Sequence, residues 1–154
     1  MEASRRPLRV FFDTSALIAG SHSRTGAAFA LLQLASLGVV DGRISDVVRI
    51  EAERNVRAKL PGALPALRVM VDEVLTMASD PADVDLGRVR DWADPKDQPI
   101  LAAALGDACP FLVTLNQRDF WPPDEAIRVV RPPELVMAIR ELVAGLGGTR
   151  HAHR

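Results

Sequence analysis

The sequence contains a single cysteine, Cys109, among its 154 residues. A lone thiol provides neither a disulfide framework nor a zinc site built from cysteines. No apolar run approaches the roughly 20 residues of a membrane-spanning helix, and the polar stretch from Met1 to Pro7 lacks the apolar segment of a signal peptide. We therefore expect a cytoplasmic protein without a membrane partner.

Charge of one sign is not in excess either. The chain has 19 Lys and Arg residues against 20 Asp and Glu residues, which gives a formal net charge of −1 at pH 7. This overall balance gives no indication of a polyanionic partner. Lys59 and Lys96 are the only lysines, and the other basic residues are arginines. Function must therefore be inferred from the local arrangement of residues.

Several enzyme motifs are missing. No Gly-x-Gly-x-x-Gly follows the first apolar run, and no P-loop is present, which argues against nucleotide-binding folds of those types. A phosphatase of the haloacid dehalogenase type needs a second aspartate two residues after the first, where this chain has Ser15. A phosphoacceptor receiver domain needs a lysine after a later strand, and neither lysine fits.

The composition is that of a globular domain, with 48% hydrophobic and 25% charged residues. The length predicts one domain over residues 1–154. We expect its folded core at 7–145 and a flexible tail at 147–154. No internal repeat or second domain is evident.

Short apolar strands alternate with helical patterns along the chain. The patterns predict strands at 8–12, 39–44, 111–114 and 126–130, and helices at 15–19, 25–37, 46–59, 64–77, 98–106 and 134–144. Gly20 is expected to break the first helix, Gly38 to end the second, and the pattern at 86–92 is ambiguous, with a short helix as one interpretation. This alternation predicts an α/β fold with a mostly parallel sheet between helix layers.

Two acidic residues are expected at one edge of this sheet. Asp13 directly follows the first strand, and Asp119 lies in the loop after the strand at 111–114. The carboxyl ends of parallel strands share an edge with the starts of the helices that follow them. Glu51 and Asp97, near the starts of two helices, reach the same edge if those helices lean over it.

Each acid also has a purely structural interpretation. Asp13 and Asp97 stand where helix N-caps occur, and Asp119 suits a turn. Glu51 is compatible with a solvated helix face, in which case Glu53 or Asp46 is the relevant acid. Only the set of four acids carries functional weight.

Four clustered carboxylates repel one another, and burial raises their pKa values. A divalent cation relieves both effects, and oxygen ligands without histidine or cysteine favour Mg²⁺ or Mn²⁺ over zinc. Such ions activate water for phosphodiester cleavage.

Four segments of the chain resemble the motifs of PIN domains. Val10-Phe11-Phe12-Asp13-Thr14-Ser15-Ala16-Leu17 resembles the opening strand and first acid, and Ser45 followed by Glu51, Arg54 and Val56 resembles the second motif. Asp94-Pro95-Lys96-Asp97-Gln98-Pro99-Ile100-Leu101-Ala102-Ala103-Ala104 resembles the third motif, and Leu112-Val113-Thr114-Leu115-Asn116-Gln117-Arg118-Asp119-Phe120 the fourth. The motifs occur in the family's order from Val10 to Phe120.

This resemblance implies a three-layer α/β/α sandwich with a central, mostly parallel sheet and an acidic pocket at its carboxyl edge. It also implies divalent-metal-dependent hydrolysis of RNA. Many bacterial members are VapC-like toxins of type II toxin–antitoxin pairs. The resemblance therefore makes an RNA substrate, an antitoxin partner and a homodimer expected features.

Carried over by position, the resemblance gives Asp13, Glu51 and Asp97 as the ligands of the principal ion. The family often has an aspartate two residues after the threonine of the fourth motif, where this chain has Asn116. Either Asp119 supplies the fourth carboxylate, or Asn116 completes the shell through its carbonyl oxygen or through water. A non-catalytic PIN-like module that binds RNA or protein is the alternative that Asn116 leaves open.

Polar residues beside these acids have supporting roles in this interpretation. We expect Thr14, Ser15 and Thr114 to orient waters or carboxylates. Asp94 is an accessory candidate, with shaping of the turn as its other interpretation.

Basic residues beside the acids suit contact with RNA phosphates. Arg118, Arg49 and Arg54 are the candidates, since arginine binds phosphate bidentately. Their alternative is a solvated surface.

Overall fold

The computed structural model describes the backbone of residues 6–152 and the side chains of residues 6–145. These residues contain a five-stranded sheet with the order β3-β2-β1-β4-β5, and all four neighbouring pairs run parallel. The strands are β1 (Leu8–Phe12), β2 (Val40–Ile44), β3 (Thr76–Met77), β4 (Phe111–Val113) and β5 (Arg128–Val130). The predicted parallel sheet is confirmed, with one further strand, β3.

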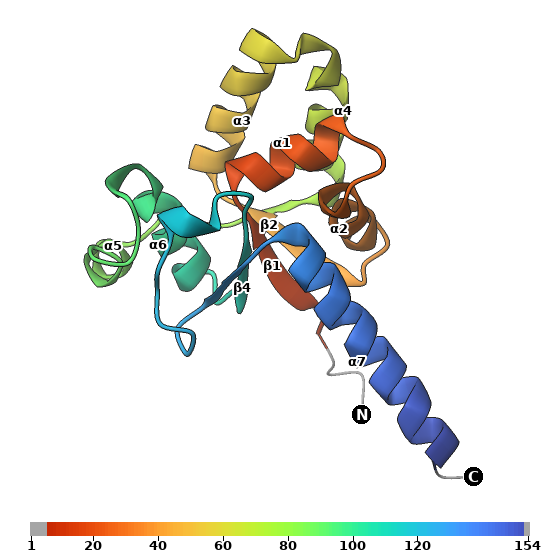
Figure 1. Cartoon of the computed structure of the whole chain (residues 1–154). Coiled ribbons are helices and arrows are strands. Elements are labelled where there is room, and N and C mark those ends of the chain that lie inside the picture. The colour runs from red at the N-terminus through yellow and green to blue at the C-terminus, as the bar shows by residue number, and fades with distance from the viewer. Residues whose placement is uncertain (1–5, 153–154) are drawn as a thin grey trace.

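Helices cover both faces of the sheet, as Figure 1 shows. They are α1 (Thr14–His22), α2 (Ala27–Ser36), α3 (Asp46–Lys59), α4 (Leu64–Val69), α5 (Asp83–Arg88), α6 (Gln98–Gly106) and α7 (Pro132–Ala152). Helices α1 to α4 pack against one another on one face, where α2 also contacts α7, and α5 pairs with α6 on the other. This is the expected α/β/α sandwich.

The central strand β1 is fixed by burial on both faces. Val10, Phe11 and Phe12 are fully buried, which explains why β1 appears in the sequence as a continuous apolar run instead of an alternating one. Strand β1 pairs with β2 on one side and with β4 on the other. Residues that follow β1 therefore lie at the centre of the carboxyl edge.

The helix predicted at 64–77 is wrong in its second half. Helix α4 ends at Val69, a π-helical turn η3 (Met70–Val74) follows, and Thr76–Met77 then pair with the end of β2. The main-chain N–H of Ala78 donates to the carbonyl of Ile44 at 2.7 Å. Pairing with a strand that is distant in sequence overrides the local helical periodicity here.

The predicted break at Gly20 is also wrong, because α1 continues through it to His22. Gly20 is buried against α2, and a Cβ there would lie 2.5 Å from Leu32 Cδ1 and 3.0 Å from the Ala28 carbonyl oxygen. The glycine thus permits close approach of two helices. Gly38, by contrast, has φ +78° and ends the α2 segment as predicted.

The two remaining helix predictions need smaller changes. The ambiguous 86–92 pattern corresponds to α5, which begins earlier, at Asp83. Helix α7 begins at Pro132 and continues to Ala152, beyond the predicted end at 144. The predicted flexible tail at 147–154 lies partly outside the described residues and stays a prediction.

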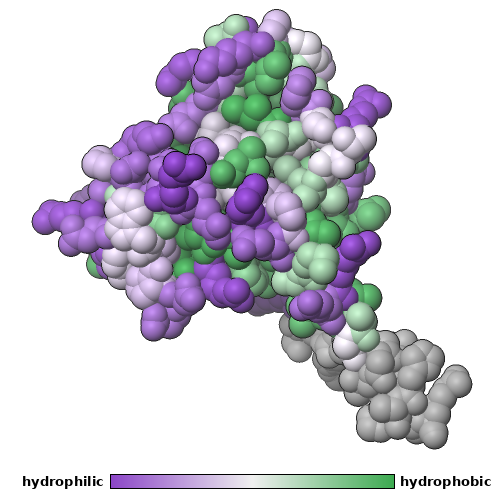
Figure 2. Space-filling model, viewed as in Figure 1, coloured by the Kyte–Doolittle hydropathy of each residue, from purple (hydrophilic) through white to green (hydrophobic). Residues whose placement is uncertain are grey.

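The surface in Figure 2 is more hydrophilic on the side of α5 and α6 and more apolar toward α2. Among the described residues, no helix has the length and apolar character that crossing a membrane requires.

A candidate metal centre at the carboxyl edge

Asp13 lies directly after β1 and is only 4% exposed. It stands at the N-cap position of α1 but makes no capping hydrogen bond through its side chain. Its Oδ2 instead accepts hydrogen bonds from Thr114 Oγ1 at 2.7 Å and from Ser15 Oγ at 3.2 Å. Asp13 is therefore the N-cap residue by position, but its carboxylate does not cap the helix and is held toward the sheet edge.

The two hydroxyls that hold Asp13 are themselves fixed by main-chain donors. The N–H of Asn116 donates to Thr114 Oγ1 at 2.9 Å, and the N–H of Leu115 donates to Ser15 Oγ at 3.0 Å. These donors force the hydroxyl hydrogens of Thr114 and Ser15 toward other acceptors, of which Asp13 is one. The loop after β4 thus orients the acid that follows β1.

Glu51 approaches Asp13 from α3. Thr14, the first residue of α1, donates its Oγ1 hydrogen to Glu51 Oε1 at 2.8 Å. Burial raises the pKa of Asp13, hydrogen bonds from Thr114 and Ser15 act against this, and the negative charge of Glu51 raises it further. Helix α3 therefore leans over the sheet edge, as the sequence interpretation required.

Asp97 lies where the 3₁₀ turn η4 (Pro95–Asp97) joins α6. Burial raises its pKa to about 6, and the negative charges of Asp13, Asp119 and Asp94 add to the shift, whereas Lys96 opposes it. Its side chain makes no capping hydrogen bond at the start of α6. Within the described part of the chain, its buried Oδ2 has no hydrogen-bond partner.

Asp97 also belongs to a second cluster of acids. Carboxylate oxygens of Asp94, Asp97 and Asp119 lie within 4.8 Å of one another. The N–H of Asp94 donates to the carbonyl of Asp119 at 3.0 Å, and the N–H of Asp97 donates to the carbonyl of Asp94 at 2.8 Å. Asp94 thus both shapes the turn and contributes a carboxylate.

A pocket of about 450 Å³ opens at this edge. Its walls come from α1, α3, η4 and the loop after β4, and its lining residues are Asp13, Thr14, Ser15, Ile18, Glu51, Arg54, Asn55, Lys59, Leu60, Lys96, Asp97 and Asn116. Three of the four predicted catalytic acids and Asn116 therefore line one pocket. Asp119 is not part of the lining and approaches the site through Asp97.

The donor set fits a hard divalent cation. The acids supply carboxylate oxygens, Asn116 adds an amide carbonyl, and among the side chains described here, those of residues 6–145, no histidine or cysteine lines the pocket. The buried Asp97 Oδ2 accepts no hydrogen bond from a described residue and is therefore free to act as a ligand atom. A Mg²⁺ or Mn²⁺ ion would stabilise the charged forms of these clustered carboxylates, of which Asp13 and Asp97 have raised pKa values.

The predicted RNA-binding arginines lie in different surroundings. Arg54 lines the pocket. Arg49 lies 2.7 Å from Asp46 and 3.6 Å from Glu53 through its guanidinium nitrogens, so its charge is already paired. Arg118 is exposed on η5 (Gln117–Asp119) and does not line the pocket. A role in RNA binding stays a prediction for all three.

Five residues of the pocket lining are not among the predicted site residues, and the polar ones are Asn55, Lys59 and Lys96. Asn55 and Lys59 follow Glu51 at intervals of four residues, which places all three on one face of α3. This spacing was a usable signal. Lys96 is adjacent to Asp97 in the sequence, but its neighbour Asp119 is brought close only by the fold.

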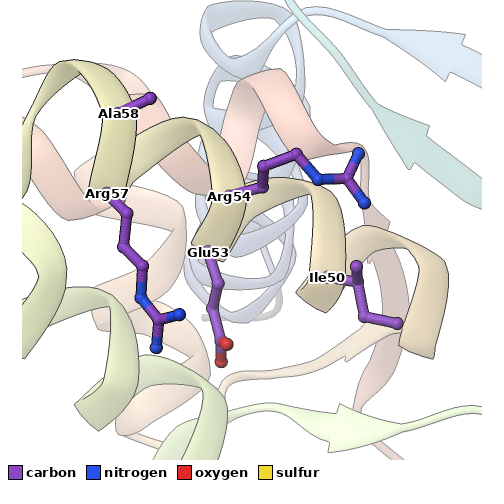
Figure 3. A pocket seen from close by; sticks show the side chains of 5 residues that line it. All are labelled: Ile50, Glu53, Arg54, Arg57 and Ala58. Atoms are coloured by element: carbon purple, nitrogen blue, oxygen red, sulfur yellow. The ribbon is translucent and has the colours of Figure 1, made fainter.

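A second pocket, of about 470 Å³, lies on α3 beside the first. Figure 3 shows its five lining residues, with Glu53 and Arg57 extending to the same side of the helix and Arg54 extending in another direction. Arg54 belongs to the lining of both pockets. A cationic side chain therefore connects the acidic pocket with the outer surface of α3.

Comparisons with known proteins agree with this fold. A family model described as PIN domain matches residues 9–118, and no curated protein matches the chain. A chain in the crystal structure of VapBC2 from Rickettsia felis, bound to a DNA fragment from their promoter, superposes with a TM-score of 0.62. The two sequences are 15% identical, and the superposition covers 80% of this chain and 98% of the other.

Proposed function

The chain belongs to the PIN-domain family, and from this premise we propose that it is a divalent-metal-dependent endoribonuclease. The observation that carries the proposal is the buried oxygen of Asp97, which accepts no hydrogen bond from a described residue, in a pocket that Asp13 and Glu51 also line. Buried carboxylates are costly to the fold unless something compensates their charge. A bound cation provides that compensation.

In this proposal Asp13, Glu51 and Asp97 hold the ion, and Asn116 completes the shell from the loop after β4. Asp119 contributes its negative charge from the far side of Asp97. When bound, Mg²⁺ or Mn²⁺ supplies Lewis-acid chemistry, which makes water nucleophilic at neutral pH and stabilises charge on the scissile phosphate.

The protein's own contribution is orientation. Thr114 and Ser15 fix one oxygen of Asp13, and Thr14 fixes one oxygen of Glu51. Because these hydroxyls are held before substrate arrives, little reorganisation is needed during the reaction.

Cationic side chains at the rim would bind the substrate. Arg54 and Lys59 on α3 line the pocket beside the acids, and they suit phosphates on either side of the scissile bond. Arg118 remains a candidate from the neighbouring loop. Arg49 is a weaker one, because Asp46 and Glu53 already compensate its charge.

We further propose that the protein acts in the cytoplasm as the toxin of a type II toxin–antitoxin pair. The similarity of fold to a chain of the VapBC2 structure supports this assignment. A homodimer is part of the proposal. A candidate face for it is the apolar groove of about 890 Å³ that α2 shares with α7.

The test is cleavage of a single-stranded RNA by purified protein with MnCl₂ or with EDTA. We expect Asp13→Asn to lower the cleavage rate by at least ~100-fold, because it removes a ligand charge. Asp124→Asn, which neutralises an exposed acid outside the pocket, is the matched control and should cleave normally. Cleavage by Asp13→Asn at the wild-type rate, or in EDTA, would overturn the proposal.

A non-catalytic PIN-like module that binds RNA or protein is the second candidate. The uncharged Asn116 in the pocket lining favours it. Calorimetric titration with MnCl₂ separates the two. The nuclease requires binding that Glu51→Gln and Asp97→Asn both weaken, whereas the binding module predicts that neither substitution matters.

A further inference from the structure

Lys96 provides a positive charge at the three-carboxylate cluster of Asp94, Asp97 and Asp119. Its Nζ lies 3.8 Å from Asp119 Oδ2 and 4.0 Å from Asp97 Oδ2. Among the described residues, it is the only basic side chain within 4.0 Å of any of these carboxylates. Among the described residues, one lysine is therefore the only nearby positive charge for a cluster of three carboxylates.

The ammonium approaches these acids from the solvent side. The Lys96 side chain is 73% exposed, whereas the side chains of Asp97 and Asp119 are only 13% and 22% exposed. Neither carboxylate receives a hydrogen bond from Lys96, because both distances are too long for one. The lysine is thus a loosely held counter-ion placed at the mouth of the cluster.

We propose that Lys96 takes the place of a second cation, so that the metal centre binds one divalent ion instead of two. This inference rests on the proposed metal-dependent function. Asp13, Glu51 and Asp97 are the residues that would hold the principal ion. On the other side of Asp97, the Lys96 ammonium compensates the charge that Asp94 and Asp119 add. A divalent ion on that side would have to displace the ammonium.

The chain contains a matched comparison in its other lysine. Lys59 lines the same pocket from α3 but makes no ion pair with the cluster among the described residues. Removing either lysine changes the net charge equally. Only removal of Lys96 takes away a charge that lies within 4.0 Å of two of the three acids, Asp97 and Asp119. The two variants therefore separate a local effect of charge from a general one.

The experiment is calorimetric titration of MnCl₂ into wild type, Lys96→Met, Lys96→Arg and Lys59→Met. The number of bound ions is checked independently by the electron paramagnetic resonance signal of free Mn²⁺. We expect one ion per chain for wild type, Lys96→Arg and Lys59→Met. Lys96→Met should bind a second ion as well. The dissociation constant of this second ion should be at least ~tenfold lower than that of any second ion in wild type, because the positive ammonium group that repels it is removed.

The double variant with Lys96→Met and Asp119→Asn should no longer bind the second Mn²⁺ ion. If wild type binds one ion and Lys96→Met binds the same number with the same affinity, the role of Lys96 is overturned and the nuclease proposal stands. If no variant binds Mn²⁺, both proposals are overturned. Circular dichroism melting shows whether each variant is folded, and Lys96→Gln provides a second neutral variant.

Discussion

At Asp97, stability of the fold and the proposed activity oppose each other. Burial and three neighbouring acids raise its pKa to about 6, so its charged form destabilises the metal-free protein at neutral pH. A group whose pKa is raised by folding contributes stability at low pH, and this contribution disappears as the pH rises through the folded pKa. The metal-free protein should therefore lose stability between about pH 4 and pH 6 on account of Asp97.

Asp97→Asn should consequently stabilise the protein in EDTA. At pH 7 we expect a free energy of unfolding higher by about 1–3 kcal/mol, and the difference should vanish below about pH 4. Urea denaturation at pH 4 and pH 7 measures both values, with Asp124→Asn as a surface control. A less stable Asp97→Asn at pH 7 would contradict this account of the site.

Asp107 shows the opposite behaviour. It accepts hydrogen bonds from Arg43 Nε and Nη2, both at 2.8 Å, and its side chain is 10% exposed. Burial favours the neutral acid, but the hydrogen bonds and charge of Arg43 outweigh it and hold the pKa of Asp107 below its usual range. Its stabilising contribution is therefore present above the unfolded pKa of about 4 and is lost as the pH falls.

Asp107→Asn is expected to lower the free energy of unfolding by about 2–3 kcal/mol at pH 7, because it removes the nearer charged partner of the largely buried Arg43 guanidinium and leaves only Asp41, at 3.4 Å. Asp85→Asn provides the comparison. Its partner Arg88 is 50% exposed, so a loss below about 1 kcal/mol is expected. Urea denaturation of the two variants measures the difference, and equal losses would show that burial of the Arg43 pair has no special effect.

At the scale of elements, the packing of α1 on α2 depends on the missing side chain of Gly20. A Cβ at that position would collide with Leu32 and with the main chain of α2. Gly87 is also helical, but a Cβ there would meet nothing within 4 Å. Replacing these two glycines by alanine is therefore expected to change stability in opposite directions.

Gly20→Ala should destabilise the protein by about 1–3 kcal/mol through overpacking. Gly87→Ala should stabilise it by up to about 1 kcal/mol through helix propensity. Thermal melting followed by circular dichroism distinguishes the signs. A Gly20→Ala variant as stable as wild type would mean that α1 and α2 separate without cost.

At the scale of the whole molecule, strand order decides where the site forms. From β1 the chain proceeds to β2 and β3 on one side, then returns to β4 and β5 on the other. The reversal lies between β1 and β4, and open parallel sheets bind ligands at such a point. There Thr114, which follows β4, donates to Asp13, which lies 101 residues earlier in the sequence.

Much of this arrangement was predictable from the sequence. The buried strand that precedes Asp13 and the start of α6 at Gln98 follow from local apolar patterns and proline placement. Strand β3 was not predictable, because two residues acquire strand geometry only by pairing with β2. The length of α1 was missed because Gly20 is a helix breaker locally and a packing residue in the fold.

The sequence by itself determined the order of the elements and the acids that follow them, since these depend on the periodicity and chemistry of neighbouring residues. Only the tertiary structure decided which of these acids line the same pocket. Asp13, Glu51 and Asp97 line the pocket, whereas Asp119 meets Asp97 from the other side, next to Lys96. The reason is physical: charge interactions depend on distance in space, which packing sets between residues far apart in the chain.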